Sequence, residues 1–275
     1  MNPLTQSKNT TIVPLLISLM LGCFALSPQA RATCQEGCLA NNNTVLGDDA
    51  LLLLNNTGIS NTAIGFKALH FTSTGSHNAA NGGYALWRNT TGNDNTANGD
   101  SALMRNTTGS SNTASGRDAL SFNTTGNFNT AAGVGALQSN TTGSDNTGLG
   151  FEALFANTTG FLNTATGWRA LSSNTSGGSN TATGSLALAL NTTGTANTAN
   201  GVLALYHNST GSNNTATGRD AMNNNTTGVL NTASGQTTLF WNTTGSYNTA
   251  SGARGLYSNT TGSFNTSAGG VRPLW

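Results

Sequence analysis

A strict 17-residue repeat constrains this chain more than any other feature of its sequence. From Asn55 to Trp275 the chain divides without gaps into thirteen units of the pattern N-T-T-G-x-x-N-T-A-x-G-x-x-A-L-x-x. Self-similarity at a short fixed period is typical of solenoids, in which each unit buries its apolar side against its neighbours. The period therefore predicts one stacked rod over this span.

The positions of the unit, numbered 1 to 17 from Asn55, differ sharply in how much they vary. Positions 4 and 11 are Gly and position 7 is Asn in all thirteen units, and position 15 is Leu in eleven, with Met222 and Pro273 as exceptions. Position 8 is Thr except at Ala79, and position 14 is mostly Ala. Positions 5, 6, 10, 12, 13, 16 and 17 accept almost any residue. A recent duplication would have preserved all positions alike, so a structural requirement holds the fixed ones.

The fixed positions predict an all-β fold, a parallel β-solenoid or β-roll with one 17-residue coil per unit. Two invariant glycines suit the tight corners of a coil that has two short strands and two turns. Along the first repeat, strand alternation puts Asn61, Ala63 and Gly65 on one side and Ile64 on the other. In-register Asn and Thr side chains can hydrogen-bond to their copies above and below. At ~4.8 Å per coil, the thirteen coils give a rod of roughly 60 Å.

The recurring side chains are expected to form a structural ladder inside the rod, with Leu as its main apolar layer. The predicted ladder residues are Asn61, Asn95, Asn112, Gly65, Gly99, Leu69 and Leu103. A helical interpretation, in which two units make one tetratricopeptide-like repeat, is disfavoured. Each unit carries two Gly, and each Gly costs ~1 kcal/mol in a helix.

The first segment of the chain has the features of a cleavable signal peptide, predicted to span residues 1–32. Lys8 supplies a positive charge, Ile12–Leu26 is an apolar run, and Ala30–Ala32 offers a small-x-small cleavage site. A lipoprotein signal with Cys23 as the lipidated residue is the rival interpretation. Either way the mature chain is expected to be extracellular or attached to the cell surface.

Two further segments follow the signal peptide. Residues 33–54 contain an imperfect copy of the repeat and are expected to cap the thirteen-coil solenoid of residues 55–275. Cys34 and Cys38 could close a disulfide in an oxidising compartment, or remain two free thiols. The apolar run before them is interrupted by Pro14 and is shorter than the ~20 residues that a membrane span needs. No transmembrane anchor is therefore expected in this chain.

Charge and face patterning suggest what the rod binds. The formal net charge is only +1, and the ten Lys and Arg are scattered singly, so no nucleic-acid partner is expected.

Thr62 and Ala68 are fixed although strand alternation places them on the opposite face from Asn61, Ala63 and Leu69. Both faces of the coil are thus predicted to be constrained. We expect rods to associate side by side into a homo-oligomer that buries the second face.

Segments such as Asn61–Leu69, which reads N-T-A-I-G-F-K-A-L, resemble the head repeats of YadA-like trimeric autotransporter adhesins. The resemblance covers the thirteen units and implies a left-handed β-roll, a trimer, and an outer surface that binds host or matrix ligands. Similar repeats also occur in phage-fibre-like proteins. The unit departs from the family in its length of 17 residues and in the frequent Asn, Ser or Thr where the family has Ile or Val. The chain also stops at Trp275 without a coiled-coil stalk or β-barrel anchor, so membrane anchoring is not implied.

Side chains that could carry catalysis are dispersed. His70, His77 and His207 are isolated, and no nucleophile triad, phosphate loop or metal-ligand set can be assembled. Asp118 and Glu152 share one unit position, but two coils, about 10 Å, separate them. Solvated surface charges are the simpler interpretation. The sequence therefore predicts no enzyme activity, no cofactor and no metal site.

Two functions from different classes are compatible with this pattern. A surface adhesin or structural fibre would present the variable positions, where Trp87, Trp168 and Trp241 are candidates for ligand or subunit contact. An ice-binding solenoid would instead use a threonine ladder, formed by Thr62, Thr96, Thr113 and Thr130. A flat ice-binding face usually has a second ordered rank of side chains. The position two residues beyond the threonines instead varies, with Ile64, Asn98 and Leu149, which disfavours this function.

Overall fold

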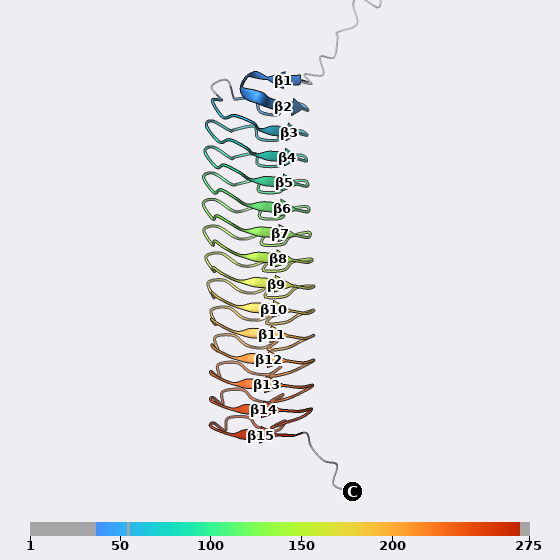
Figure 1. The fold of residues 1–275 in the computed structure, drawn as a ribbon, viewed down its shortest axis with the longest axis vertical. Coiled ribbons are helices and arrows are strands. Elements are labelled where there is room, and N and C mark those ends of the chain that lie inside the picture. Colours follow the sequence, from blue (N-terminus) through green and yellow to red (C-terminus); the bar gives the residue numbers. More distant parts are fainter. Residues whose placement is uncertain (1–36, 54–55, 270–275) are drawn as a thin grey trace, which may run out of the picture. The chain divides into compact units, whose positions relative to one another are not determined.

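The computed structural model describes residues 37–53 and 56–269, and these form a parallel β-solenoid (Figure 1). The elements are β1 (Gly37–Leu39), the 3₁₀ helix η1 (Ala40–Asn42), β2 (Asn43–Leu46), β3 (Thr62–Ile64), β4 (Ala79–Asn81), β5 (Thr96–Asn98), β6 (Thr113–Ser115), β7 (Thr130–Ala132), β8 (Thr147–Leu149), β9 (Thr164–Thr166), β10 (Thr181–Thr183), β11 (Thr198–Asn200), β12 (Thr215–Thr217), β13 (Thr232–Ser234), β14 (Thr249–Ser251) and β15 (Thr266–Ala268). The predicted fold class, an all-β solenoid of 17-residue coils, is confirmed.

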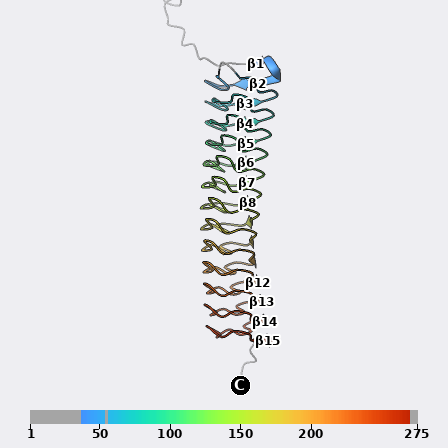
Figure 2. The ribbon, with the colours of Figure 1, turned by 90° about the vertical axis from the view of Figure 1, so that its left-hand side faces the viewer.

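The described strands form one sheet in which sequence order is also spatial order. From β2 to β15 each strand runs parallel to the next, and a residue pairs with its copy one unit later, as Thr181 does with Thr198. The step from Thr44 in β2 to Thr62 in β3 is one residue longer, because one residue is inserted between the first copy and the regular units. A view at right angles shows the same regular stacking (Figure 2).

Among the described strands, β1 alone runs antiparallel to its neighbour. Gly37 pairs with Val45 and Leu39 with Asn43, and η1 reverses the chain between them. Asn41 and Asn42 make this reversal in the left-handed region, at φ 65° and 59°. The hairpin covers an edge of β2 whose backbone groups would otherwise be unpaired. Cys38 lies in β1, whereas residues 1–32, Cys34 and Trp275 lie outside the described part of the chain.

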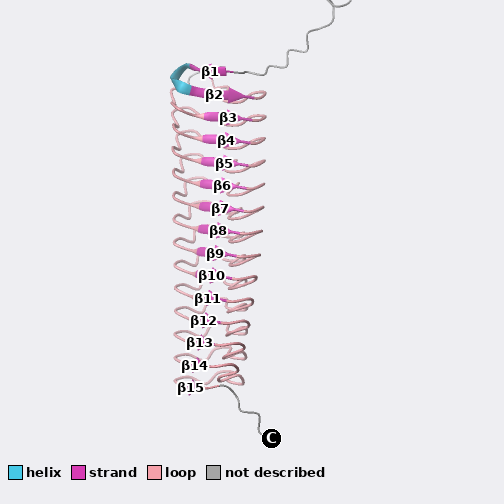
Figure 3. Ribbon diagram, turned by 45° about the vertical axis from the view of Figure 1, so that its right-hand side comes forward, coloured by secondary structure: helices cyan, strands magenta, loops and turns pink. Residues whose placement is uncertain are grey.

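Each regular coil contains one three-residue strand, so the expectation of two strands per coil was wrong. Most of the coil is loop and turn (Figure 3). Positions 13 and 15 adopt the left-handed region, as at Ser101 (φ 58°) and Leu103 (φ 51°), and an extended strand cannot continue through them. Position 11 needs Gly because Gly99 has φ 138°, and a Cβ there would lie 2.6 Å from the Gly116 carbonyl oxygen.

The apolar core is a continuous column of small and medium side chains. Ala97, Ala102 and Leu103, at positions 9, 14 and 15, are buried in the third coil, and most other coils repeat this set. Ala68 and Leu69 are both fully buried, because they lie in a turn where strand parity does not apply. Ala68 therefore does not mark a second face, which corrects half of the argument for side-by-side association.

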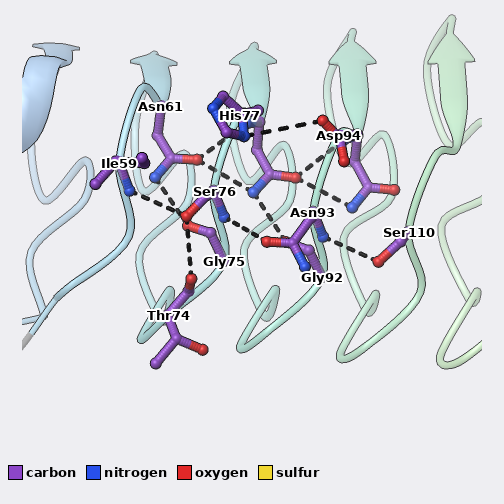
Figure 4. Close-up of polar contacts among 12 residues, drawn as sticks. Ile59, Asn61, Thr74, Gly75, Ser76, His77, Gly92, Asn93, Asp94 and Ser110 are labelled. Carbon is purple, nitrogen blue, oxygen red and sulfur yellow. Dashed lines mark hydrogen bonds and ion pairs between the residues drawn. The ribbon is translucent and has the colours of Figure 1, made fainter.

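The asparagines of position 7 form a hydrogen-bonded ladder through the interior (Figure 4). The amide of Asn78 donates to Asn61 Oδ1 (3.1 Å) and to the Gly92 carbonyl (2.9 Å). Its own Oδ1 accepts from the backbone nitrogen (3.0 Å) and the amide (3.1 Å) of Asn95. Every hydrogen-bonding site of this buried amide is used, the condition under which an interior polar network stabilises a fold.

Position 1 provides a second interior ladder. Asn106 Nδ2 donates to Asn89 Oδ1 (2.7 Å) and to the Gly109 carbonyl (2.8 Å), and the pattern continues to Asn259. Position 4 carbonyls accept from both ladders, and a side chain at Gly109 would collide with Asn106 Oδ1. Thr72 interrupts this ladder, and its buried hydroxyl has no partner.

Two more ladders lie nearer the surface. At position 5 a side-chain oxygen accepts from the backbone of the preceding coil, as in Ser76 N to Asn93 Oδ1 and Asn93 N to Ser110 Oγ (Figure 4). At position 2 the hydroxyl donates to the carbonyl of the next coil, as in Thr90 Oγ1 to Thr107 O, 2.8 Å. Nine of the thirteen units carry Ser, Asn or Thr at position 5, so this position was wrongly described as accepting almost any residue.

Candidate functional site

Aromatic side chains are sorted onto one edge of the coil. Sixteen aromatic residues lie in the described part of the chain, and eight occupy positions 16 and 17, which we call the aromatic strip. Its aromatic residues are Phe71, Trp87, Phe122, Phe155, Tyr206, Phe240, Trp241 and Tyr257. The other eight divide equally between positions 12–13 and positions 5–6. Two of seventeen positions thus hold half of the rings, which singles out this edge as a candidate binding surface.

The two columns of the strip differ in depth. The rings of position 16 are half-buried, whereas those of position 17 are exposed, as Phe71 and Trp241 are. Because successive coils bring equivalent positions close together, neighbouring rings touch. Phe71 and Trp87 meet edge to face at 5.3 Å, and Phe240 stacks on Tyr257 at 5.4 Å. Such pairs hold the rings in fixed orientations.

One groove lies on the N-terminal part of the strip and has a volume of about 530 Å³. We call it the N-terminal groove, and it is lined by Leu53, Phe71, Ser73, Arg88, Thr90 and Thr107. Its aromatic and cationic groups come from position 17, and its hydroxyls come from position 2 of the following coils. The Arg88 guanidinium lies over the Trp87 ring, 4.9 Å from its centre.

A second groove of about 440 Å³, the central groove, lies further along the same strip. At position 16, Phe155 and Tyr206 lie three coils apart, and the two coils between them carry the small residues Ser172 and Ala189. Arg169, at the wall of the groove, forms an ion pair with Glu152 at 2.6 Å. The groove therefore exists because small residues interrupt a column of rings, and its local charge is balanced.

The three tryptophans named as candidate contacts do not form one site. Trp87 lies at position 16, Trp168 at position 12 and Trp241 at position 17. Trp168 and Trp241 are each 46% exposed, whereas Trp87 is half-buried, with its Nε1 enclosed and unpaired. Trp87 and Trp241 belong to the aromatic strip, and Trp168 lies outside it beneath the Arg169 guanidinium.

Charged groups of the described residues are dispersed over the surface. Four ion pairs form among them: His77–Asp94, Arg117–Asp118, Arg169–Glu152 and Arg219–Asp220. Each joins residues of the same coil or of adjacent coils. Within residues 37–53 and 56–269, no cluster of three His, Cys, Asp or Glu side chains could hold a metal ion, and no helix is long and apolar enough to cross a membrane.

The threonines of position 8 form a separate feature, which we call the threonine rank. It runs on the outer face of the sheet from Thr44 in β2 to Thr266 in β15, interrupted at Ala79. Its side chains are exposed or half-exposed, and among the described residues their hydroxyls form no hydrogen bond with one another. The neighbouring position 10 is polar over six successive strands, with Thr166, Thr183, Asn200, Thr217, Ser234 and Ser251.

Sequence inspection missed the aromatic strip, although its signal was present. Sorting the aromatic residues by unit position would have given the neighbouring positions 16 and 17 eight rings, against four each for positions 12–13 and positions 5–6. The grooves give no such signal. They depend on how a turn with alternating left-handed residues brings position 17 of one coil next to position 2 of the following coils.

Comparisons with protein-family models, with curated proteins and with solved structures give no match for this chain. The resemblance to YadA-like head repeats therefore depends on the repeat motif alone.

Proposed function

We propose that this chain is an exported, non-enzymatic surface adhesin or structural fibre, and that the aromatic strip is its ligand-binding surface. The observation that carries the proposal is the sorting of half of the described rings onto positions 16 and 17, where both grooves lie. Three of the strip's eight rings are exposed, Phe71, Phe122 and Trp241, and the other five are half-buried. Apolar groups that line a groove on a rigid scaffold mark binding surfaces more often than scattered ones do.

The proposal is supported by the separation, within each coil, of the residues that hold the fold together from those on the surface. Buried residues at positions 1, 4, 7, 9, 14 and 15 hold the coils together, and of the strip only Ser121, Ala189 and Asn223 are buried. A rod of this kind can change its outer side chains without changing its fold, because each coil contacts only its neighbours. That property suits a protein that displays a long surface to a partner.

Export, assembly and handedness belong to the same proposal. The signal peptide of residues 1–32 would deliver the rod to the outside of the cell, and a homo-oligomer, a trimer of left-handed rolls by resemblance, would be its assembled form. Sedimentation velocity on the purified secreted chain tests the assembly. A single species with the mass of one chain at all concentrations would contradict it.

A surface-binding assay tests the role of the strip. We would replace strip rings with residues that the same columns already carry, Phe155→Ser and Tyr206→Ser at position 16, where Ser172 occurs naturally. Phe128→Ser and Tyr247→Ser at position 6 remove two exposed rings elsewhere and serve as the matched control.

We expect the strip variant to lose binding to whole cells and to matrix-coated surfaces. The control should bind as the parent does, and both should keep the parent's far-ultraviolet circular dichroism. Equal loss in both variants, or in neither, would contradict a binding role for the strip.

The threonine rank favours a second candidate, an ice-binding function. Position 8 places exposed or half-exposed threonines on thirteen of fourteen successive parallel strands, and position 10 adds a second polar column from Thr166 to Ser251. Ile64 and Leu149 interrupt that second column elsewhere. Measuring thermal hysteresis of the parent and of a Thr181→Leu/Thr215→Leu variant decides the matter. Hysteresis that this variant loses, and that the strip variant keeps, would support ice binding over adhesion.

A further inference from the structure

We propose that the N-terminal groove and the adjoining Arg105 bind an acidic glycan, a polysaccharide that carries carboxylate or sulfate groups. The inference rests on the proposed function and names the ligand class for one part of the aromatic strip. It follows from three properties of the groove: an uncompensated pair of arginines, hydroxyl oxygens available as acceptors, and an exposed ring.

The arginine pair is the first property. Arg88 and Arg105 occupy position 17 of successive coils, and neither belongs to any of the four ion pairs among the described residues. Each guanidinium lies against a ring, Arg88 over Trp87 at 4.9 Å and Arg105 over Phe122 at 4.4 Å. A guanidinium that lies over a ring can still use the N–H groups at its edge for bidentate hydrogen bonds to an anion.

The residues that line the groove include no Asp or Glu. Positions 16, 17 and 2 contain no Asp or Glu in any of the thirteen units, and the acids of the regular coils lie at positions 6, 12 and 13. The two acids nearest in sequence already have contacts of their own. Asp94 faces His77 at 3.9 Å, and Asp100 accepts a hydrogen bond from Ser101. The groove therefore presents a locally positive surface on a chain whose formal net charge is only +1.

The hydroxyls decide which kind of anion fits. Ser73, Thr90 and Thr107 each donate their hydroxyl hydrogen to a backbone carbonyl of the next coil, at 2.8–2.9 Å. Their oxygens are left as acceptors, so a ligand must supply O–H or N–H donors as well as negative charge. Sugar hydroxyls supply such donors beside the anionic group, whereas in DNA the phosphodiester backbone offers only acceptors and the donors are on the bases.

The exposed ring completes the set. Phe71 is 40% exposed, and its edge-to-face contact with Trp87 fixes its orientation at the groove. A flat aromatic surface can cover the C–H face of a sugar ring while the neighbouring groups bind its polar edge. A nucleic acid would need a longer run of cations than the two that this column provides.

The test compares binding of the full chain to four immobilised polymers: a polygalacturonate, dextran sulfate, uncharged dextran and a single-stranded oligonucleotide. The variant Arg88→Ser/Arg105→Ser puts into both sites a residue that position 17 already carries at Ser139 and Ser173. The control Arg117→Ser/Arg219→Ser removes the same charge from position 12, where Ser185 occurs naturally.

We expect the parent to bind at least one of the two acidic glycans, with salt-sensitive affinity, and to bind dextran and the oligonucleotide more weakly. Arg88→Ser/Arg105→Ser should raise the Kd for that glycan about tenfold or more, the scale of losing charge-assisted hydrogen bonds. Phe71→Ser should weaken binding further, and the control should leave the Kd unchanged. The polyuronate and sulfated arms distinguish the two anionic groups.

Three results would overturn the inference. They are no binding to either acidic glycan, tighter binding to the oligonucleotide, and equal losses in the variant and its control. If cell and matrix binding still depends on Phe155 and Tyr206 in that case, the proposed function stands and only the ligand assignment fails.

Discussion

Replacing Asn146 with alanine tests whether the interior amides hold the coils together. Its Nδ2 donates to Asn129 Oδ1 (3.1 Å) and to the Gly160 carbonyl (2.8 Å). Its Oδ1 accepts from the backbone nitrogen and the amide of Asn163, both at 3.1 Å. After the substitution, Asn129 Oδ1 keeps the backbone nitrogen of residue 146, and the Gly160 carbonyl keeps Asn157 Nδ2. Two buried donors of Asn163 are left without an acceptor.

The size of the effect follows from those two donors. A buried polar group without a partner costs about 1–3 kcal/mol, so Asn146→Ala should cost about 2–6 kcal/mol of unfolding free energy. Asn140→Ala at position 1 also leaves two groups unpaired, Asn123 Oδ1 and one N–H of Asn157, and should have a similar effect. Ser139→Ala, in a column that already carries Ala156, should change stability by less than about 0.5 kcal/mol.

The reverse change repairs a natural interruption. Thr72 has a buried hydroxyl without a partner, and Asn89 has no asparagine before it to accept its amide. Thr72→Asn supplies the missing acceptor for Asn89 and a donor for the Gly75 carbonyl. We expect a gain of about 1 kcal/mol, the net value of a typical intramolecular hydrogen bond.

Guanidinium denaturation followed by circular dichroism measures these changes, and amide hydrogen exchange locates them. Exchange near the substituted coil should accelerate about tenfold for each 1.4 kcal/mol lost. Coils far from the substitution should be unaffected, because each coil contacts only its neighbours. If Asn146→Ala is no more destabilising than Ser139→Ala and Thr72→Asn gives no gain, the ladders do not stabilise the rod.

Three further predictions concern glycine, leucine and an ion pair. Gly150→Ala should abolish cooperative folding, because Gly150 has φ 136° and a Cβ there would lie 2.5 Å from the Gly167 carbonyl oxygen. The control Gly148→Ala, at a position where other coils carry Ala, should change the unfolding free energy by no more than about 1 kcal/mol. Leu120→Ile should be much more destabilising than Leu120→Met, and thermal melts of the two variants compare them. Residue 120 is buried at φ 52°, a backbone region that β-branched residues avoid, whereas Met is tolerated because Met222 already fills the equivalent site. Glu152→Gln should cost less than about 1 kcal/mol, because the Arg169 side chain is 45% exposed; an unfolding midpoint far below the parent's would contradict this.

Much of the coil could be predicted because the residue type at each fixed position indicates its own backbone conformation or burial. The strand at positions 8–10, the buried Leu of position 15 and the Asn of position 7 follow from period and residue type. The single strand per coil was missed, although a signal existed. Positions 6 and 15 never carry Val, Ile or Thr in any of the thirteen units, as expected where the backbone is left-handed, as at Leu103. The prediction that Ala68 and Leu69 lie on opposite faces was wrong, because it assumed strand alternation in a segment that is a turn.

The surfaces were harder to predict, because they depend on neighbours in other coils. Whether a position-16 residue lines a groove is decided by the size of the side chains one or two units away, as Ser172 and Ala189 decide it beside Phe155. The contact of Arg105 with Phe122 of the next coil likewise depends on the coil geometry rather than on residue type. These contacts between side chains can be predicted from the sequence only when the coil geometry is already known.

If the strip determines ligand choice independently of the fold, its specificity should be transferable along the rod. His207 and Asn224 occupy position 17 of successive coils next to Trp241, and Ser209 and Thr226 at position 2 donate to carbonyls as Thr90 does. The substitutions His207→Arg/Asn224→Arg, made in the Arg88→Ser/Arg105→Ser background, should restore binding to the same acidic glycan. Placing the two arginines at position 12 instead, with Val202→Arg/Gln236→Arg, adds equal charge without ring or hydroxyls. Restored binding in that control would mean that charge alone, and not the arrangement of the strip, selects the ligand.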